Sequence, residues 1–489
     1  MKPLEQSLWT KEDVSMATKG LPSGMMSNGW LAKGVSIDSR TCLPGDMFIA
    51  LSGTNFDGHN YVSDALASGA VAAIVSRIPE GLENSPALVV VKDSNQALID
   101  LARFARARTS AKIIGITGSV GKTTTKDGLT AALSVCGNTH STIGNLNNHI
   151  GAPLTLSRLP NNAVYSVIEL GMNHSGELNE TSTLSQPDIA VITNIEAVHL
   201  ENFDSVYGIA DAKSEIFAGL GNTGTAILNR DNVYFAYLSS IAAEYGVSRV
   251  LSFGADPDSY SRLISMKNIA GGSDVTAEVN GQTIKYRLNT PGRHQVKNSL
   301  AILAVVASLE ADVVSASAEL ANITAPLRRG RHYKVTSSKG EFIVIDDSYN
   351  ASPASMRASF EVLASATSVS SGRKVAVLGD MLELGPDSRK IHAGLAQHLT
   401  TNKIDQVFTA GTLMSELDKA LPKYMRGGHR NTPEELLPIV MQSIRDGDVV
   451  LVKGSLGSRA GPIADALINT YEDEGTSFQI LNGDNNNVI

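Results

Sequence analysis

Short apolar runs, separated by segments with helical spacing, recur along almost the whole chain. Runs rich in valine, isoleucine or alanine end in glycine or a polar residue, as in AVAAIVSR (70–77) and KIIGITG (112–118). Between them, segments such as NQALIDLARFARARTS (95–110) place apolar residues at helical spacing. Continuous apolar strands that alternate with helices are typical of parallel sheets covered on both faces. The pattern therefore predicts an α/β fold.

The predicted elements fall into three blocks, which fits a chain of 489 residues at ~150 residues per domain. The third block begins near Leu327. The predicted strands are 45–53, 70–77 and 87–93 in the first block, 112–118, 164–171, 188–195, 225–231 and 249–254 in the second, and 341–350, 374–381, 405–411 and 448–454 in the third. The predicted helices are 61–69, 95–110, 125–137 and 298–311.

Composition narrows the class of protein without identifying its chemistry. A net charge of −8 provides no basic surface for nucleic acid or for an anionic membrane. No stretch approaches ~18 uninterrupted apolar residues, and the first residues lack the apolar core of a signal peptide. The two cysteines, Cys42 and Cys136, lie far apart, as in proteins of a reducing compartment. We therefore expect a cytoplasmic protein with no nucleic-acid partner and no membrane span.

The segment ITGSVGKTTT (116–125) lies between a predicted strand and a predicted helix. A Walker A loop has a glycine five residues before its second glycine, but Ile116 occupies that position here. A glycine-rich turn at a helix start still points backbone N–H groups at a phosphate. Lys122 would bridge phosphates, and the Thr123 hydroxyl would bind Mg²⁺, which prefers oxygen ligands. The segment predicts a phosphate-binding loop; a small-residue connection is the alternative.

Three further residues lie where a nucleotide site would need them. Glu169 ends an apolar strand, where a carboxylate is costly unless it meets a cation. His199 follows the next strand, and Lys213 lies on a helix among small residues. Taken singly, a solvated acid, a satisfied histidine and a surface lysine are the alternatives. Because ligands bind at the carboxyl ends of strands in open α/β sheets, the group predicts a magnesium-nucleotide site.

These motifs resemble those of the Mur ligases, ATP-dependent amide-forming enzymes of peptidoglycan synthesis. The loop TGSVGKTTT has the short Gly-x-x-Gly-Lys-Thr form of that family, which accounts for the missing first glycine. The similarity extends through SIDSRTCLPGD in the first block and GNLNNHIGAPLTL, ELGMNHSGE, AKSEIF and GRHQVKNSLAILA in the second. In the third block, DDSYNASPASM, LGDMLELG and VLVKGSLGSR are similar to the branch that joins D-alanyl-D-alanine to UDP-MurNAc-tripeptide.

The resemblance implies three α/β domains. Residues 1–110 would bind the UDP-sugar-peptide, residues 111–326 would form a central P-loop ATPase-like parallel sheet, and residues 327–489 would form a Rossmann-like domain for the incoming dipeptide. The γ-phosphoryl group of ATP would pass to the tripeptide carboxylate, giving an acyl phosphate that the amine of D-Ala-D-Ala attacks. The implied cofactors are ATP and Mg²⁺, and we expect a monomer.

The resemblance also implies roles for single residues, each at a position that matches a family motif. The implied catalytic residues are Lys122, His199, Lys213 and Arg331. The implied ATP contacts are Gly118, Ser119, Gly121, Lys122, Thr123, Thr124, Asn298 and Asp347. The implied substrate contacts are Ser39, Arg40, Asn147, Asn148 and Asn350. The implied metal ligands are Thr123, Glu169, His199 and, if it is carbamylated, Lys213.

At two places in the third block, adjacent or nearby residues of the same type leave open which one matches the family position. Asp347 matches the acid near the nucleotide ribose, but the adjacent Asp346 is an alternative. Arg331 matches an interdomain arginine that reaches the γ-phosphate, and Arg328 and Arg329 lie close to it in sequence.

Other positions depart from the family pattern or allow a second interpretation. A carbamate would make Lys213 an anionic metal ligand, and a plain solvated lysine is the alternative. Gln295 replaces the asparagine usual after His294, and His149 stands where an acid is more usual, so His149 is assigned no role.

Related activities are less consistent with the motifs. Folylpolyglutamate synthases and cyanophycin synthetases have a similar ATPase core, but the first block and LGDMLELG disfavour them. The tripeptide-forming ligases are nearer, yet the third block shows no Asp-Asn-Pro-Arg-like motif. A nucleotide-gated regulatory protein without catalysis is the alternative from another class. It is disfavoured because the whole set of phosphate-loop and metal-site residues is intact.

Overall fold

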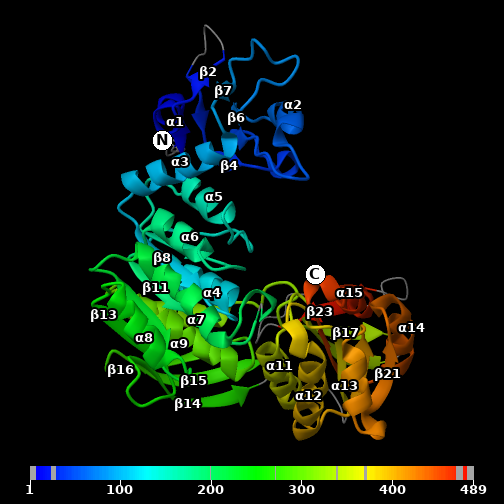
Figure 1. Ribbon diagram of the computed structural model, residues 1–489. Coiled ribbons are helices and arrows are strands. Elements are labelled where there is room, and N and C mark those ends of the chain that lie inside the picture. Colours follow the sequence, from blue (N-terminus) through cyan, green and yellow to red (C-terminus); the bar gives the residue numbers. More distant parts are fainter. Residues whose placement is uncertain are drawn as a thin grey trace.

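The computed structural model describes residues 7–23, 29–198, 200–269, 271–337, 340–367, 372–469 and 477–481. Within these residues, three large sheets follow one another along the chain, together with a two-stranded ribbon. Figure 1 shows the N-terminal unit above the middle unit and the C-terminal unit beside it. The predicted three-part α/β architecture is confirmed, whereas the boundaries near residues 110 and 326 remain predictions.

The N-terminal sheet has the strand order β2-β7-β6-β5-β4, in which β4 to β7 are parallel and β2 is an antiparallel edge. The predicted strands of the first block are confirmed as β5, β6 and β7. The strands are β1 (Trp9–Thr10), β2 (Leu21–Pro22), β3 (Leu31–Ala32), β4 (Gly34–Ser36), β5 (Asp46–Ile49), β6 (Ala72–Val75) and β7 (Leu88–Val90). The helices are α1 (Lys11–Thr18), α2 (Val62–Ala67) and α3 (Ser94–Arg108).

The N-terminal unit is anchored on the middle unit by an apolar core and by hydrogen bonds to backbone carbonyls. Leu154, on helix α5 of the middle unit, belongs to the apolar core that also contains Trp9. The Trp9 indole N–H donates to the Ser157 carbonyl at 2.8 Å, and Arg158 Nε donates to the Val35 carbonyl at 2.6 Å. The Arg108 guanidinium lies 4.0 Å from the centre of the Trp9 ring. The shared apolar core and the two hydrogen bonds join the two units into one packed body, whereas the Arg108 contact lies within the N-terminal unit.

The middle sheet has the order β16-β15-β14-β13-β12-β11-β8-β10-β9, with β8 flanked by β11 and β10. Strands β8 to β13 are parallel; the five predicted strands of this block are confirmed as β8, β10, β11, β12 and β13, whereas β9 was not predicted. The strands are β8 (Lys112–Thr117), β9 (Thr139–Ser141), β10 (Tyr165–Glu169), β11 (Ile189–Ile192), β12 (Thr225–Asn229), β13 (Arg249–Gly254), β14 (Ser261–Ile269), β15 (Gly272–Val279) and β16 (Gln282–Leu288). The helices are α4 (Lys122–Ser134), α5 (Gly151–Ser157), α6 (Glu177–Ser185), α7 (Val206–Ser214), α8 (Phe235–Glu244), α9 (Arg293–Ser308) and α10 (Val313–Glu319).

The C-terminal sheet has the order β21-β20-β19-β22-β18-β17-β23, in which β18 to β22 are parallel and β17 and β23 antiparallel. The four predicted strands of this block are confirmed as β18, β19, β20 and β22. The strands are β17 (Arg331–Ser337), β18 (Gly340–Asp347), β19 (Lys374–Gly379), β20 (Gln406–Ala410), β21 (Arg426–Arg430), β22 (Val449–Lys453) and β23 (Ser477–Ile480). The helices are α11 (Pro353–Ser365), α12 (Ser388–Thr401), α13 (Met414–Ala420), α14 (Pro433–Ser443) and α15 (Gly461–Asn469).

The longest helix of the middle unit, α9, is buried over the consecutive residues Leu300 to Val306. None of the helices in the described segments is long and apolar enough to cross a membrane.

Candidate active site

The predicted phosphate loop leaves the central strand β8 and enters helix α4. Gly118 and Gly121 have positive φ angles of 147° and 86°, a conformation that residues with a side chain rarely adopt. A Cβ at position 118 would also lie 2.0 Å from Thr193 Oγ1. The Ser119 N–H donates to the Asn194 carbonyl at 2.8 Å, which ties the loop to the end of β11. The loop therefore has a fixed conformation at the N-terminus of α4, where its free backbone N–H groups can donate hydrogen bonds to a phosphate.

Lys122 and Thr123 form the first turn of α4, directly after the loop. Lys122 Nζ donates to the Gly118 carbonyl at 2.7 Å, so the amine lies across the loop. Burial lowers the pKa of Lys122; the charge of Glu169 opposes this effect and that of Arg329 adds to it. A strongly donating cation is thus placed where phosphate oxygens would lie.

Glu169 ends β10 in register with Ile116 of β8, so its carboxylate lies beside the loop. The residue is only 1% exposed. Its Oε1 accepts hydrogen bonds from the Thr123 hydroxyl at 3.2 Å and from Asn147 Nδ2 at 2.7 Å. Its Oε2 is buried and has no partner among the described residues. A buried carboxylate oxygen without a donor is costly unless a cation meets it.

The donor set at this point suits a hard cation. The Thr123 hydroxyl and the Glu169 carboxylate offer oxygen, the ligand that Mg²⁺ prefers, and Mg²⁺ commonly completes its shell with phosphates and water. Neither here nor elsewhere in the described ranges is there a group of three or more His, Cys, Asp or Glu residues that could hold a metal ion. His199, predicted to serve a second Mg²⁺, lies outside the described residues.

Lys213 lies on α7 with its side chain buried, only 2% exposed. The alternative of a solvated surface lysine is therefore wrong. Burial, with the neighbouring charge of Lys122 adding to it, lowers the pKa of Lys213 well below its ordinary value. A lysine in this setting favours the neutral amine, which is the form that reacts with CO₂.

The depressed pKa predicts how stability depends on pH. Between the folded-state pKa of Lys213 and its ordinary value of about 10.5, the unfolded chain binds the extra proton, so stability rises with pH across that window. In CO₂-free buffer, Lys213→Met should raise the melting temperature below the window and flatten its rise with pH. Lys112→Met, at a lysine that is 57% exposed, should leave the profile unchanged. An identical pH profile in wild type and Lys213→Met would contradict the expectation.

Asn298, the predicted adenine contact, lies beside the loop on α9. Its Oδ1 would be 2.7 Å from a Cβ at position 121, so the side chain packs directly against Gly121. Thr124 follows Thr123 on α4 and is partly exposed. His294, near the start of α9, lies within electrostatic range of Asp347 and Lys453 in the C-terminal unit. Helix α9 thus spans the distance from the loop to the third sheet.

The two adjacent aspartates of β18 have different environments. Asp346 is buried and accepts hydrogen bonds from the Ser348 N–H and hydroxyl, and burial raises the pKa of its carboxyl. Asp347 Oδ2 accepts from Lys453 Nζ at 2.7 Å and from the Ser359 hydroxyl at 2.6 Å. Because Asp347 also lies within electrostatic range of His294, it is the member of the pair that faces the middle unit. Figure 1 shows the middle and C-terminal units side by side.

The predicted uridine-nucleotide residues lie in the N-terminal unit. Arg40 is exposed, and its guanidinium donates to both carboxylate oxygens of Asp38 at 2.9 and 2.6 Å. Ser39 lies beside it in a single helical turn, Ser39–Thr41. This guanidinium would have to exchange Asp38 for a diphosphate in order to bind one.

The three asparagines predicted to contact substrate make different contacts. Asn147 holds the Glu169 carboxylate, whereas Asn148 Oδ1 accepts from the backbone N–H groups of Ile150 and Gly151 at the start of α5. Asn350 is exposed, and its carbonyl accepts from Lys453 Nζ at 3.0 Å.

Three polar residues at the junction of the middle and C-terminal units were not predicted from the sequence. They are Asn145 in GNLNNHIG, Tyr349 in DDSYN and Lys453 in VLVKGSLGSR. Asn145 Nδ2 donates to the Tyr349 hydroxyl across the junction. Lys453 is 2% exposed at the end of the buried strand β22. Like Glu169, Lys453 is a charged residue at the end of an apolar strand, so the same sequence pattern could have identified it.

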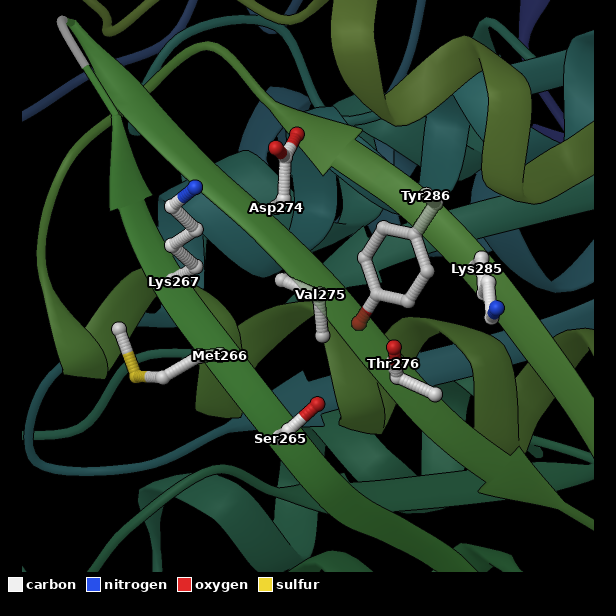
Figure 2. Close-up of a pocket in the computed structure, with 8 residues that line it drawn as sticks. All are labelled: Ser265, Met266, Lys267, Asp274, Val275, Thr276, Lys285 and Tyr286. Atoms are coloured by element: carbon white, nitrogen blue, oxygen red, sulfur yellow. The ribbon is translucent and has the colours of Figure 1, made fainter.

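A separate hollow of about 490 Å³ lies on the antiparallel strands β14 to β16. Figure 2 shows its lining, which includes Lys267, Asp274 and Lys285. Strands β12 and β13 separate it from β11 and the phosphate loop, so it is not part of the site described above.

The fold and site define a three-part α/β protein with a glycine-rich loop between β8 and α4, where the sequence predicts phosphate binding. Three family models match in order: the Mur ligase family catalytic domain at residues 32–106, the Mur ligase middle domain at residues 116–306, and the Mur ligase glutamate ligase domain at residues 330–456. The chain belongs to the Mur ligase family.

Individual relatives match over nearly the whole chain. The UDP-N-acetylmuramoyl-tripeptide–D-alanyl-D-alanine ligase of Escherichia coli (strain K12) is 36% identical over 435 residues, which cover 88% of this chain and 93% of the relative. A crystal structure of MurF from Acinetobacter baumannii has a TM-score of 0.81 at 31% identity, covering 94% of this chain and 98% of its own. A crystal structure of MurF ligase from Thermotoga maritima in complex with ADP has a TM-score of 0.75 at 27% identity, covering 90% and 98%.

Proposed function

We propose that this protein is an ATP-dependent ligase that adds D-alanyl-D-alanine to UDP-MurNAc-tripeptide through an acyl phosphate. The observation that carries the ATP-dependent step is the buried Glu169 carboxylate, with one unpaired oxygen, beside Lys122 and Thr123 at the phosphate loop. The similarity to the Escherichia coli ligase over most of both chains supports the choice of substrates.

In this proposal the loop residues neutralise and orient the phosphates. The backbone N–H groups of the loop other than that of Ser119, together with the Lys122 amine, bind phosphate oxygens, and Asn298 lies where it can contact the adenine. Thr123 and Glu169 would hold Mg²⁺, which supplies positive charge to the phosphates when it is bound. Side chains perform no covalent step, so the residues act by placing the groups in line and offsetting charge.

The substrates would approach from the two other units. Ser39 and Arg40 would bind the uridine diphosphate, for which a guanidinium is well suited. Asn147 and Asn148 would contact the muramoyl-peptide, and Asp347 with Asn350 would face the nucleotide ribose from the C-terminal unit. Closure of the C-terminal unit onto the other two would exclude water from the acyl phosphate, which water would otherwise hydrolyse. We also propose a cytoplasmic monomer.

Lys213 and His199 would serve a second metal ion, with Lys213 as a carbamate. The neutral amine attacks CO₂, forming the N–C bond and releasing one proton, which leaves a carboxylate on a long arm. We expect protein kept in ¹³C-bicarbonate to show one carbamate carbon resonance that is absent from Lys213→Met. Lys126→Met is the matched control, because Lys126 is also buried but donates to the carbonyls of Thr142 and Gly144. A spectrum unaffected by Lys213→Met would contradict the modification.

The activity itself is tested by phosphate release from ATP and Mg²⁺ with UDP-MurNAc-tripeptide, with and without D-Ala-D-Ala. We expect release only with both substrates, together with a nucleotide-pentapeptide identified by mass. Hydrolysis that is independent of both substrates, or none at all, would overturn the ligase assignment.

A further inference from the structure

Lys126 is a buried lysine on helix α4, one turn after Lys122. The residue is 3% exposed, and its Nζ donates to the Thr142 carbonyl at 3.0 Å and to the Gly144 carbonyl at 3.2 Å. Asp127 Oδ1 lies 2.6 Å from the same Nζ. These three contacts match the three N–H donors of a lysine. No donor is left for a phosphate, so any effect of Lys126 on the candidate site must pass through its partners.

Two of these partners belong to residues 142–147, the segment that follows strand β9, here called the 142–147 loop. The loop begins against the end of β10, where the Thr142 hydroxyl accepts from the Glu169 N–H at 3.1 Å. It ends at Asn147, whose Nδ2 donates to Glu169 Oε1 at 2.7 Å. The loop that Lys126 holds therefore contacts both the backbone and the carboxylate of Glu169.

The 142–147 loop depends on hydrogen bonds for its path. Residues 143–146 are exposed, and a Cβ at Gly144 would meet no atom within 4 Å, so close packing does not fix the chain at that glycine. The hydrogen bonds from Lys126 hold the first half of the loop, and the Gly171 N–H, which donates to the Asn147 carbonyl at 2.8 Å, holds its end. Without the first anchor, the loop would change its path and the Asn147 side chain would lose its fixed place beside the carboxylate.

We propose that Lys126 is a positioning residue that orients the Glu169 carboxylate for Mg²⁺ through the 142–147 loop. By fixing the loop it keeps Asn147 on Oε1, and Oε2, which has no partner among the described residues, stays available to the cation. Partners of a metal ligand outside its coordination shell act in this way, by setting the orientation of the ligand before the metal binds. The inference rests on the proposed ATP- and Mg²⁺-dependent function and adds a residue that contacts neither phosphate nor metal.

The first test measures the binding of Mn²⁺, which takes the same oxygen ligands as Mg²⁺ and is followed by the electron paramagnetic resonance of the free ion. It uses the full chain with the β,γ-methylene analogue of ATP and without peptide substrates. Lys126→Met keeps an unbranched apolar stem but removes the donors, and it should weaken Mn²⁺ binding about tenfold, the loss typical of removing such a partner. Lys126→Arg retains donors and should recover part of the loss. Unchanged Mn²⁺ affinity in Lys126→Met would overturn the proposal.

Lys374→Met is the matched control for this measurement. Lys374 also donates to a backbone carbonyl, that of Ala366, but it lies on β19 of the C-terminal unit. Its replacement should leave Mn²⁺ affinity at the wild-type value. An equal loss in Lys374→Met and Lys126→Met would show a general effect of removing a lysine bond and would overturn the positioning role.

The second test asks whether Lys126 acts through Asn147. Asn147→Ala should weaken Mn²⁺ binding by a similar factor, and the double variant with Lys126→Met should bind no more weakly than the weaker single variant. Additive losses would overturn the proposed route. If Lys126→Met does not fold, Asn147→Ala carries the test by itself, and an unchanged Mn²⁺ affinity in that variant would contradict the proposal.

The wild-type result separates this inference from the ligase assignment. Wild-type protein that bound the analogue but no Mn²⁺ would overturn the metal site and, with it, the role of Lys126. Normal Mn²⁺ binding together with a failed ligase assay would overturn the choice of peptide substrates alone, because no peptide substrate is present in the binding experiment.

Discussion

Replacing Lys122 with alanine is expected to reduce ATP-dependent phosphate release by about 10³-fold, the loss typical of removing one donor that stabilises developing charge. The amine already lies across the loop, 2.7 Å from the Gly118 carbonyl, so it needs only a small movement to reach a phosphate. Phosphate release at saturating ATP, UDP-MurNAc-tripeptide and D-Ala-D-Ala measures the effect. A Lys122→Ala variant that kept a tenth of wild-type activity would contradict this role.

The fold of the Lys122→Ala variant should survive. Burial lowers the pKa of this lysine, which means that the folded state disfavours its charge, so removing the amine should leave the melting temperature equal or higher. Lys112→Ala is the matched control on the preceding strand. Lys112 is 57% exposed and pairs with Asp188 at 3.1 Å, so its loss should affect neither activity nor, beyond a surface ion pair, stability.

Glu169→Gln is expected to lower activity by a comparable factor of about 10³ and to weaken the response to Mg²⁺. The amide keeps an oxygen that can accept from Thr123 and Asn147, but it removes the negative charge at the buried, unpaired Oε2. A Mg²⁺ titration of phosphate release should show a higher requirement and a lower plateau.

The melting temperature of Glu169→Gln shows whether a loss of activity comes from the site or from unfolding. Removing a buried carboxylate that lacks a cation should not destabilise the free protein. Glu177→Gln serves as the control, because this carboxylate lies at the exposed start of α6 and bonds His174 and the Asn173 N–H. An unchanged Mg²⁺ dependence in Glu169→Gln would remove the basis for a metal at this carboxylate.

The parallel strands were predictable because burial on both faces requires continuous apolar sequence. The antiparallel strands β14 to β16 were missed, since only one of their faces is buried: Val275, Ala277 and Val279 pack into the core while Asp274, Thr276 and Glu278 do not. Strand β21, Arg426–Arg430, was missed because its sequence, RGGHR, offers no apolar run at all.

The candidate site was predictable where its residues belong to one strand end or one loop. Glu169 stands out as a charge at the end of an apolar strand, and the loop stands out by its glycines. The junction of Asn145, Tyr349 and Arg329 could not be predicted, because its members come from two units and meet only through the docking of those units. Local pattern also could not decide among the three arginines, because the partners of Arg328 and Arg329, Asp465 and Tyr349, lie far from them in sequence.

The middle unit holds its two neighbours by different means. Toward the N-terminus, Trp9 and Leu154 share a dry core, which water cannot enter without a large loss of free energy. Toward the C-terminus the contacts are polar: Asn145 donates a hydrogen bond to Tyr349, and Arg357 lies 3.9 Å from the Glu196 carboxylate. Water can replace both contacts at little cost in free energy. We therefore expect the C-terminal unit alone to swing, while the other two units move as a single rigid body. A compound that bound between Asn145 and Tyr349 would break this hydrogen bond and keep the C-terminal unit from docking on the middle unit. Such a compound would inhibit the protein without resembling any of its substrates.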